Sequence, residues 1–218
     1  MSDLHATSAL LKSIPKTDRG RETLERLVEA SEELFCQKNY YETSINDIVL
    51  KAGISTGTFY IYFDNKLNLY KYIVLHCGHK VRKYIASKLS KKVLNTRYEM
   101  EREGIKTFLD YCVTNPEIFF IVWQSFFVVP GLFIAYYDDF CKQYEKRLSD
   151  AVRTGEVYLL NLEVASYVLM GASTFIAMKY IVFGPPTGLS DEQKYRIVDD
   201  FLQILKNGLF TEKAPEKL

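Results

Sequence analysis

Residues 43–66 constrain the fold more than any other stretch of this chain, because two helix-start signals there flank one glycine turn. Ser44, with Asp47 three residues later, predicts a capping box that satisfies the free amides at the start of a short helix. Gly53 supplies the left-handed conformation with which a helix commonly ends. Ser55 then predicts the cap of a second helix. The stretch is therefore predicted to form two short helices joined by a tight turn.

Such a helix-turn-helix unit suits double-stranded DNA, since a helix fits the major groove and residues near its N-terminus reach the base edges. The second helix offers hydroxyl groups, apolar surface and a glycine that lets the backbone come close. Helix N-termini also favour phosphate, because free amides point outwards there. The candidates for DNA contact by this reasoning are Ser44, Thr56, Gly57, Thr58, Tyr60, Tyr62 and Lys66. Spacing alone leaves a second interpretation open, because capped helix pairs also occur in helical proteins that bind no DNA.

Residues 20–72 resemble the N-terminal domain of the TetR/AcrR family of bacterial transcriptional regulators. The signature runs Thr43-Ser44-Ile45-x-x-Ile48, then Ala52-Gly53-Ile54-Ser55-x-Gly57-Thr58-Phe59-Tyr60-x-Tyr62-Phe63-x-Asn65-Lys66. The resemblance implies a dimeric repressor whose C-terminal domain binds an effector. It also implies that Thr56, Gly57, Thr58, Tyr60, Ile61 and Tyr62 face DNA, and that Ser44 and Lys66 hold phosphates. Phe59 and Asn68 depart from the commoner leucine and glutamate of the family, but neither belongs to the reading surface.

Hydrophobic residues make up 48% of the chain and aromatic residues 14%, which supports a substantial core. Apolar residues recur with a helical period, so an all-α fold is predicted. We expect a mobile N-terminal arm (1–17), a three-helix helix-turn-helix DNA-binding domain (18–66) and a C-terminal helical effector-binding and dimerisation domain (67–218). Outside the two short helices of the helix-turn-helix unit, we expect helices at 18–38, 66–79, 98–115, 132–153, 162–183 and 191–209. A basic helix is expected between the second and third of these, ending at about residue 97.

The last two long helices carry more apolar surface than one buried face requires. Small residues (Gly171, Ala172, Ser173 and Ala177) would let helices approach closely. A symmetric homodimer built from these two helices of each copy is therefore expected. It would also place two reading helices about one DNA turn apart. The alternative is that both are central helices of a monomer.

Aromatic side chains cluster between residues 105 and 180, which predicts a largely apolar cavity for a hydrophobic small-molecule effector. The expected lining is Phe108, Trp123, Phe127, Tyr137, Phe140, Tyr144, Met170 and Thr174. A fatty acid, its acyl-CoA or a drug-like cation would suit such a cavity better than a sugar or nucleotide. The alternative is that these aromatic residues form ordinary core.

The net charge is only +1, but residues 67–97 carry eight basic and no acidic side chains. We call this stretch the basic segment; its members are Lys71, Lys80, Arg82, Lys83, Lys88, Lys91, Lys92 and Arg97. It is expected either to be a solvated helix face or to touch DNA.

A lipid- or membrane-associated binding protein is the alternative function, motivated by the basic segment and by the uncharged run 118–137. Pro130-Gly131 would break a spanning helix, so two short helices with a kink are expected instead. The N-terminus lacks a continuous apolar core, which predicts a cytoplasmic protein.

The sequence shows no glycine-rich phosphate loop and no nucleophile motif, so we do not expect an enzyme. His76, Cys77 and His79 supply too few ligands for a metal site, and neither a metal nor a cofactor is expected. The four cysteines lie far apart and are expected to be reduced.

Overall fold

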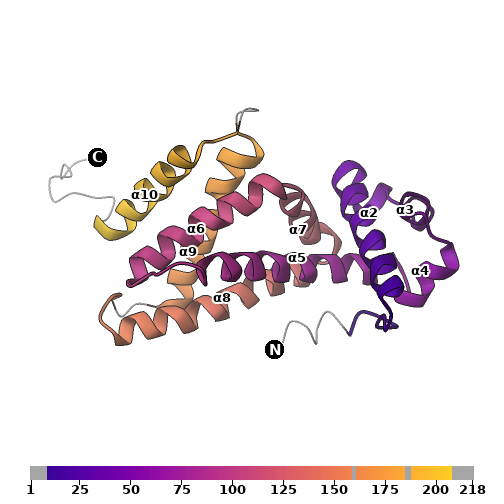
Figure 1. The fold of residues 1–218 in the computed structure, drawn as a ribbon, viewed down its shortest axis with the longest axis horizontal. Helices are drawn as coiled ribbons and strands as arrows, with labels where there is room; N and C mark the ends of the chain where they lie inside the picture. Colours follow the sequence, from indigo (N-terminus) through magenta and orange to yellow (C-terminus); the bar gives the residue numbers. More distant parts are fainter. Residues whose placement is uncertain (1–8, 159–160, 185–187, 208–218) are drawn as a thin grey trace. The chain divides into compact units, whose positions relative to one another are not determined.

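The computed structural model describes residues 9–158, 161–184 and 188–207, and within these ranges the chain is helical without a strand, as predicted. The elements are α2 (Asp18–Glu42), α3 (Ile45–Ala52), α4 (Thr56–Tyr62), α5 (Lys66–Leu89), α6 (Arg97–Thr114), α7 (Glu117–Val128), α8 (Pro130–Arg153), α9 (Leu162–Ala177), the π-helix η1 (Met178–Val182) and α10 (Asp191–Asn207) (Figure 1).

The helices form two compact units. The first unit comprises Met1–Lys83 and Asn115–Lys146, and the second comprises Tyr84–Thr114 and Arg147–Leu218. Helices α5 and α8 each contribute to both units. The expected boundary between residues 66 and 67 concerns a division of function and stays a prediction.

Helix α2 starts at the predicted residue, where the Thr17 side chain accepts a hydrogen bond from the Gly20 amide at 3.1 Å. One face of the helix is buried, and its residues follow the helical period: Leu24, Leu27, Ser31, Leu34 and Phe35. The regular helix is interrupted at Asn39, whose φ of 65° is left-handed. The helix was predicted to end one residue earlier, and asparagine tolerates this conformation better than most residues.

Helix α2 packs against α3 and α7 within the first unit. The core of the unit contains fully buried aromatic and aliphatic side chains: Leu27, Phe35, Ile48, Phe59, Phe63, Leu69, Tyr70 and Ile73. The hydroxyl of Tyr70 donates to the Ile121 carbonyl at 2.7 Å, which satisfies the polar atom of the largest of them. Gln124 of α7 donates to the Phe35 carbonyl at 2.8 Å and accepts from the Tyr40 amide, also at 2.8 Å. These bonds anchor the kinked end of α2 on α7.

Helix α5 is longer than predicted. The expected break near residue 79 is absent, and the helix continues to Leu89 before a turn and loop at residues 90–96. Gly78 lies in its interior, where a Cβ atom would stand 3.1 Å from the Tyr136 ring and 3.4 Å from the Phe140 ring. The glycine therefore serves close packing of α8 on α5 and does not end the helix.

The uncharged run 118–137 forms two helices, as predicted. Helix α7 ends before Val129, which has the non-helical angles φ −148° and ψ 84°. Helix α8 then begins with Pro130 in its first turn, where a missing amide costs nothing.

In the second unit, α6 packs against α9, η1 and α10. Arg102 of α6 holds Asp199 of α10 through two hydrogen bonds of 2.5 and 2.7 Å. Lys194 of α10 reaches Asp110 of α6 at 2.6 Å. These charge-assisted contacts fix α10 along α6.

The segment Leu162–Val182 spans α9 and η1 and is long and apolar enough to cross a membrane by length and composition. Only 28% of its most apolar window is buried in the structure. Its exposed apolar residues are Val164, Tyr167, Val168, Phe175 and Tyr180. The expected α10 end at residue 209 lies outside the described residues.

Candidate nucleic-acid interface and effector site

The two-helix unit forms by local hydrogen bonds. At the start of α3, the Ser44 hydroxyl accepts from the Asp47 amide at 3.1 Å, and the Asp47 carboxylate accepts from the Ser44 amide at 2.9 Å. These bonds lower the pKa of Asp47, the backbone bond most. Gly53 has φ 63°, and the Ile54 amide donates to the Val49 carbonyl at 3.0 Å. The predicted capping box and left-handed turn are both present.

Helix α4 begins at a serine cap. The Ser55 hydroxyl accepts from the Thr58 amide at 3.1 Å and lies 2.9 Å from the Thr58 hydroxyl. On the inner edge, Phe59 and Phe63 are fully buried. The outer edge is formed by exposed residues: Thr56, Gly57, Tyr60 and Ile61. Helix α4 is therefore held in place by its buried residues, and its outer edge is accessible to a partner.

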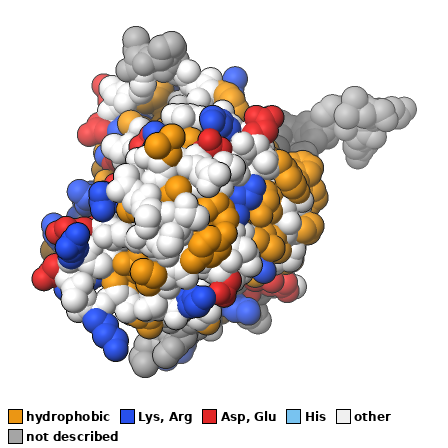
Figure 2. Space-filling model, turned by 90° about the vertical axis from the view of Figure 1, so that its right-hand side faces the viewer, with side chains coloured by type: hydrophobic (Ala, Val, Ile, Leu, Met, Phe, Trp, Pro, Cys, Tyr) orange, Lys and Arg blue, Asp and Glu red, His pale blue; other side chains and the backbone are white. Residues whose placement is uncertain are grey.

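Tyr60 and Ile61 are the large side chains of that edge, at 44% and 53% exposure. Figure 2 views the molecule from the right-hand side of Figure 1, where α3 and α4 lie. It shows hydrophobic and uncharged polar surface in the middle, with Lys and Arg side chains at several points around it. A surface of this kind can meet thymine methyl groups and base edges by apolar contact and hydroxyl hydrogen bonds.

Tyr62 departs from the prediction that it faces DNA. The residue is only 6% exposed, and its hydroxyl donates to the Gly20 carbonyl at 3.0 Å. Its own carbonyl accepts from the Lys12 amide at 2.9 Å. The helical period places Tyr62 three residues after Phe59, on the inner edge of α4, so its side chain ties α4 to the start of α2.

Lys66 also departs from its predicted role at phosphate. Its ammonium donates to the carbonyls of Tyr40 and Thr43, both at 2.8 Å, and lies 4.2 Å from the centre of the Tyr40 ring. Burial lowers the pKa of this amine. The side chain thus caps the carbonyls that the kink of α2 leaves unpaired.

Two surface ion pairs join α2 and α3. Lys51 lies 2.5 Å from Glu33, and Lys38 lies 3.9 Å from Asp47. Exposed pairs of this kind are worth little, so DNA phosphates can compete for the lysines. Ser44 remains exposed, although its hydroxyl already contacts Asp47.

Half of the members of the basic segment are paired with carboxylates, and two of these carboxylates are distant in sequence. Lys80 contacts Glu32 at 2.9 Å, and Arg82 contacts Asp139 at 2.8 Å. Lys92 pairs with Glu103, and Arg97 with Glu101. The remaining four members, Lys71, Lys83, Lys88 and Lys91, have no acidic partner among the described residues.

The predicted effector-binding residues fall in both compact units. Trp123, Phe127, Tyr137, Phe140 and Tyr144 belong to the first unit, whereas Phe108, Met170 and Thr174 belong to the second. The eight residues therefore stay a predicted set. Phe127 is 75% exposed.

Within the first unit, two of the predicted lining residues, Tyr137 and Phe140, belong to a packed aromatic array. Ring centres 5.0 to 5.5 Å apart link Phe126, Phe133, Tyr137, Tyr136 and Phe140. Burial raises the pKa of Tyr137 to about 12, while a hydrogen bond from the Trp123 indole opposes this shift. This part of the aromatic set therefore forms a packed array with a polar contact at Tyr137.

His76 lies outside this array and stacks on Tyr72, with ring centres 5.6 Å apart. Burial lowers its pKa to about 4, so the imidazole is neutral near pH 7. No cluster of three or more potential metal ligands occurs in the described ranges.

The sequence profile of the bacterial regulatory proteins of the tetR family matches residues 27–73. The HTH-type transcriptional regulator YdgC of Bacillus subtilis is 30% identical over 97 residues, covering 42% of this chain and 50% of that protein. An HTH-type regulator from the lacX 3′ region of Lactococcus lactis is 46% identical over 46 residues, covering 21% of this chain and 24% of that protein. The chain thus matches half or less of the length of these curated relatives.

Solved structures share the fold over most of the chain. A TetR-family transcriptional regulator from Syntrophomonas wolfei superposes with a TM-score of 0.74 at 20% identity, covering 88% of this chain and 99% of that one. FadR of Bacillus subtilis, solved in complex with stearoyl-CoA, superposes with a TM-score of 0.69 at 16% identity, covering 86% and 100%. The helix-turn-helix region of the chain thus matches the tetR family of bacterial regulatory proteins, and the chain shares its all-helical fold with solved TetR-family regulators.

Proposed function

We propose that this chain is a ligand-responsive transcriptional regulator that reads double-stranded DNA with α4. The observation that carries the proposal is the division of α4 into two edges. Phe59 and Phe63 fix the inner edge, and Tyr60 and Ile61 stand exposed on the outer edge. A rigid helix with free side chains near its N-terminus is what major-groove reading requires.

The DNA contacts proposed from this geometry differ from the predicted set by two residues. Thr56, Gly57, Thr58, Tyr60 and Ile61 of α4 would approach the bases, and Ser44 would approach a phosphate at the start of α3. Tyr62 and Lys66 would instead hold α4 and the end of α2 in place. The short α4 would then depend on these two residues for its orientation.

We propose that the protein acts as a homodimer through α9–η1 and α10. Exposed apolar side chains lie on both elements: Val164, Val168 and Phe175 on α9, and Ile204 and Leu205 on α10. A second copy would cover this surface and supply the twofold symmetry that a palindromic operator demands. Sedimentation analysis of wild type and Val168→Lys tests this, because a charge in the interface should shift the protein towards monomer.

The same apolar segment motivates the membrane alternative, and liposome flotation separates the two. A dimer hides the apolar face in solution and should stay unbound. Flotation of the wild type, together with a monomeric mass in detergent, would favour a membrane-bound protein over the proposed regulator.

The effector is proposed to be hydrophobic. The aromatic array with its Trp123–Tyr137 hydrogen bond supports an apolar ligand site, and the structural neighbour FadR was solved with stearoyl-CoA. We further propose repression that ends when the ligand binds, because differential affinity for two states would shift the population away from the DNA-binding one. Adding fatty acids or acyl-CoA to a preformed DNA complex should release the DNA.

DNA binding is tested by fluorescence anisotropy with duplexes from upstream of the gene itself, in rising salt. The Thr58→Ala/Tyr60→Ala double variant should bind at least about tenfold more weakly than wild type. Tyr158→Ala is the matched control, since it removes an exposed tyrosine outside the reader. Circular dichroism establishes that each variant is folded. Equal affinity of the folded double variant and the wild type would reject α4 as the reader.

A further inference from the structure

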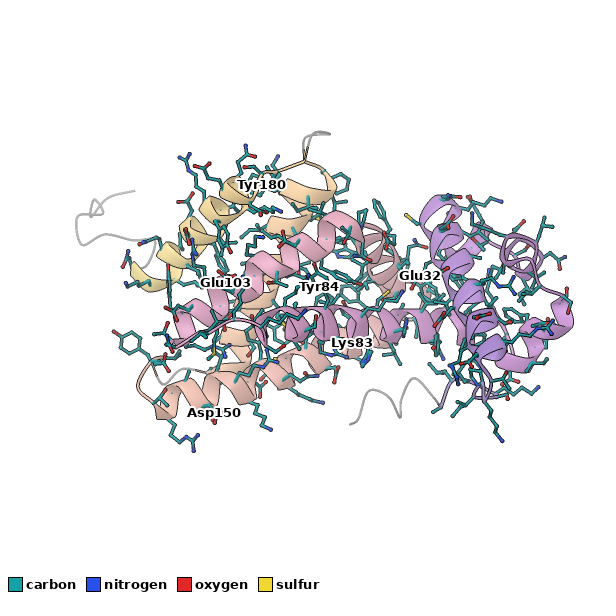
Figure 3. All side chains as sticks on the ribbon, viewed as in Figure 1. Glu32, Lys83, Tyr84, Glu103, Asp150 and Tyr180 are labelled. Carbon is teal, nitrogen blue, oxygen red and sulfur yellow. The ribbon has the colours of Figure 1, made fainter. Side chains whose placement is uncertain are left out.

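The second unit contains a hollow of about 280 Å³ that the proposed function does not use. It lies between the end of α5, the turn after it and α6. Its lining is Tyr84, Lys88, Lys91, Lys92, Lys106, Thr107 and Asp110. Figure 3 labels Tyr84 on α5 and Glu103 on α6, the two helices that bound it. Four of the seven lining side chains are lysines.

The acidic groups at the hollow are already paired. Asp110 accepts from Lys106 and from Lys194, each at 2.6 Å. Glu103 pairs with Lys92 and accepts from the Tyr195 hydroxyl at 3.1 Å. The carboxylates therefore hold the walls in place and leave the hollow itself positive.

Two lysines supply the surplus charge. Lys88 lies with its ammonium 5.2 Å from the centre of the Tyr84 ring, a weak contact that a stronger partner can displace. Neither Lys88 nor Lys91 has an acidic partner among the described residues. Lysines without a partner that line one concave surface attract an anion into it.

Thr107 adds a hydroxyl to the same lining. The residue is 4% exposed and lines the hollow beside the lysines. A threonine hydroxyl can donate one hydrogen bond to an acceptor oxygen of a ligand.

We propose that this hollow binds a phosphorylated small molecule, with Lys88, Lys91 and the Thr107 hydroxyl donating to its phosphoryl oxygens. Phosphate has three strong acceptor oxygens and nearly two charges, which matches these donors better than a monocarboxylate does. Lysine binds phosphate as a point charge without a fixed fork geometry. The volume lies near the lower end for ligand sites, so it suits a phosphorylated head group. Any role of this ligand as an effector rests on the proposed regulatory function, whereas its binding does not.

Isothermal titration calorimetry without DNA tests the binding itself. The probes are inorganic pyrophosphate, ATP and coenzyme A, each at about 50 mM and about 300 mM salt. At least one probe should bind at low salt and weaken at high salt. Lys88→Gln/Lys91→Gln should weaken that binding at least about tenfold, and Thr107→Val about threefold or more.

Lys142→Gln/Lys146→Gln is the matched control, because it removes the same charge from exposed positions of α8 in the first unit. This variant should stay within about twofold of wild type. Binding by none of the probes at low salt, or an equal loss of affinity in both double-lysine variants, would overturn the proposal.

Titration with duplex DNA tests the alternative that Lys88 and Lys91 contact nucleic acid. Weaker DNA binding by the Lys88/Lys91 variant without phosphate binding to wild type would also overturn the proposal. Loss of DNA binding by wild type alone would bear on the proposed function and leave the calorimetry unaffected.

Discussion

The ion pair between Glu32 of α2, which Figure 3 labels, and Lys80 of α5 joins the helix-turn-helix region to the helix that follows it. The Lys80 ammonium donates to both carboxylate oxygens, at 2.9 and 3.0 Å. Glu32 is 9% exposed as a residue, while the Lys80 side chain is 35% exposed. Burial raises the pKa of Glu32, and Lys80 opposes this shift. The ion pair therefore lowers the free-energy cost of an ionised carboxylate buried inside the first unit.

Lys80→Met should leave that carboxylate buried without its partner. Breaking a fully buried pair costs about 3–5 kcal/mol of folding free energy. An exposed pair is worth at most about 1 kcal/mol, and the partial exposure of Lys80 places this pair between the two limits. We expect a loss of about 2 kcal/mol near neutral pH. For a chain of this size that lowers the melting temperature by about 4–8 °C.

The loss should depend on pH with a defined sign. A carboxyl whose folded pKa is raised binds its proton more tightly in the folded state, so stability falls as pH rises from about 4.5 through the folded pKa. Removing Lys80 raises the folded pKa of Glu32 further, because the lysine lowers it. The gap between variant and wild type should therefore be larger at about pH 8 than at about pH 5.

Urea unfolding followed by circular dichroism at the two pH values measures the effect. Lys83→Met is the control, since it removes an exposed lysine of α5 that has no acidic partner among the described residues. Glu32→Met/Lys80→Met should recover at least half of the loss, because hydrophobic replacement of a buried pair is often neutral. An equal free energy of unfolding for Lys80→Met and Lys83→Met at about pH 8, or a loss that does not change with pH, would refute the reasoning.

Three further outcomes follow from single contacts. Gly53→Ala places a Cβ at φ 63° and should cost about 1–2 kcal/mol in urea unfolding, whereas no loss would contradict the left-handed turn. Tyr62→Phe removes the hydrogen bond to Gly20 and should cost about 1 kcal/mol while the DNA affinity of the folded protein stays within about twofold; a tenfold loss of affinity would restore Tyr62 to the DNA surface. Burial raises the pKa of the Cys77 and Cys36 thiols, and Cys77 is the more buried of the two. A thiol reagent should therefore modify Cys36 first in the native protein. Prompt modification of Cys77 would contradict its burial.

The helix-turn-helix unit could be predicted because its determinants are local. The capping box, the left-handed glycine and the serine cap each join residues at most five positions apart, and all of them are present. The inner stripe of α2 follows from helical period alone. The hydroxyl of Tyr62 favours a place on the DNA side, although its position three residues after Phe59 puts the side chain on the buried edge. At this position the helical periodicity predicts the orientation of the side chain better than its chemistry does.

The functions of charged side chains could not be predicted in the same way, because their partners are remote. Lys80 finds Glu32 at a separation of 48 residues, and Arg102 finds Asp199 at 97. A count over residues 67–97 gives a strongly basic segment, yet folding brings carboxylates to half of its members. What distinguishes Lys88 and Lys91 is that folding gives them no acidic partner among the described residues while placing them in one hollow with Thr107. An anion-binding site is therefore indicated by basic side chains that lack an acidic partner in the folded protein, and not by the number of basic residues in a stretch of sequence.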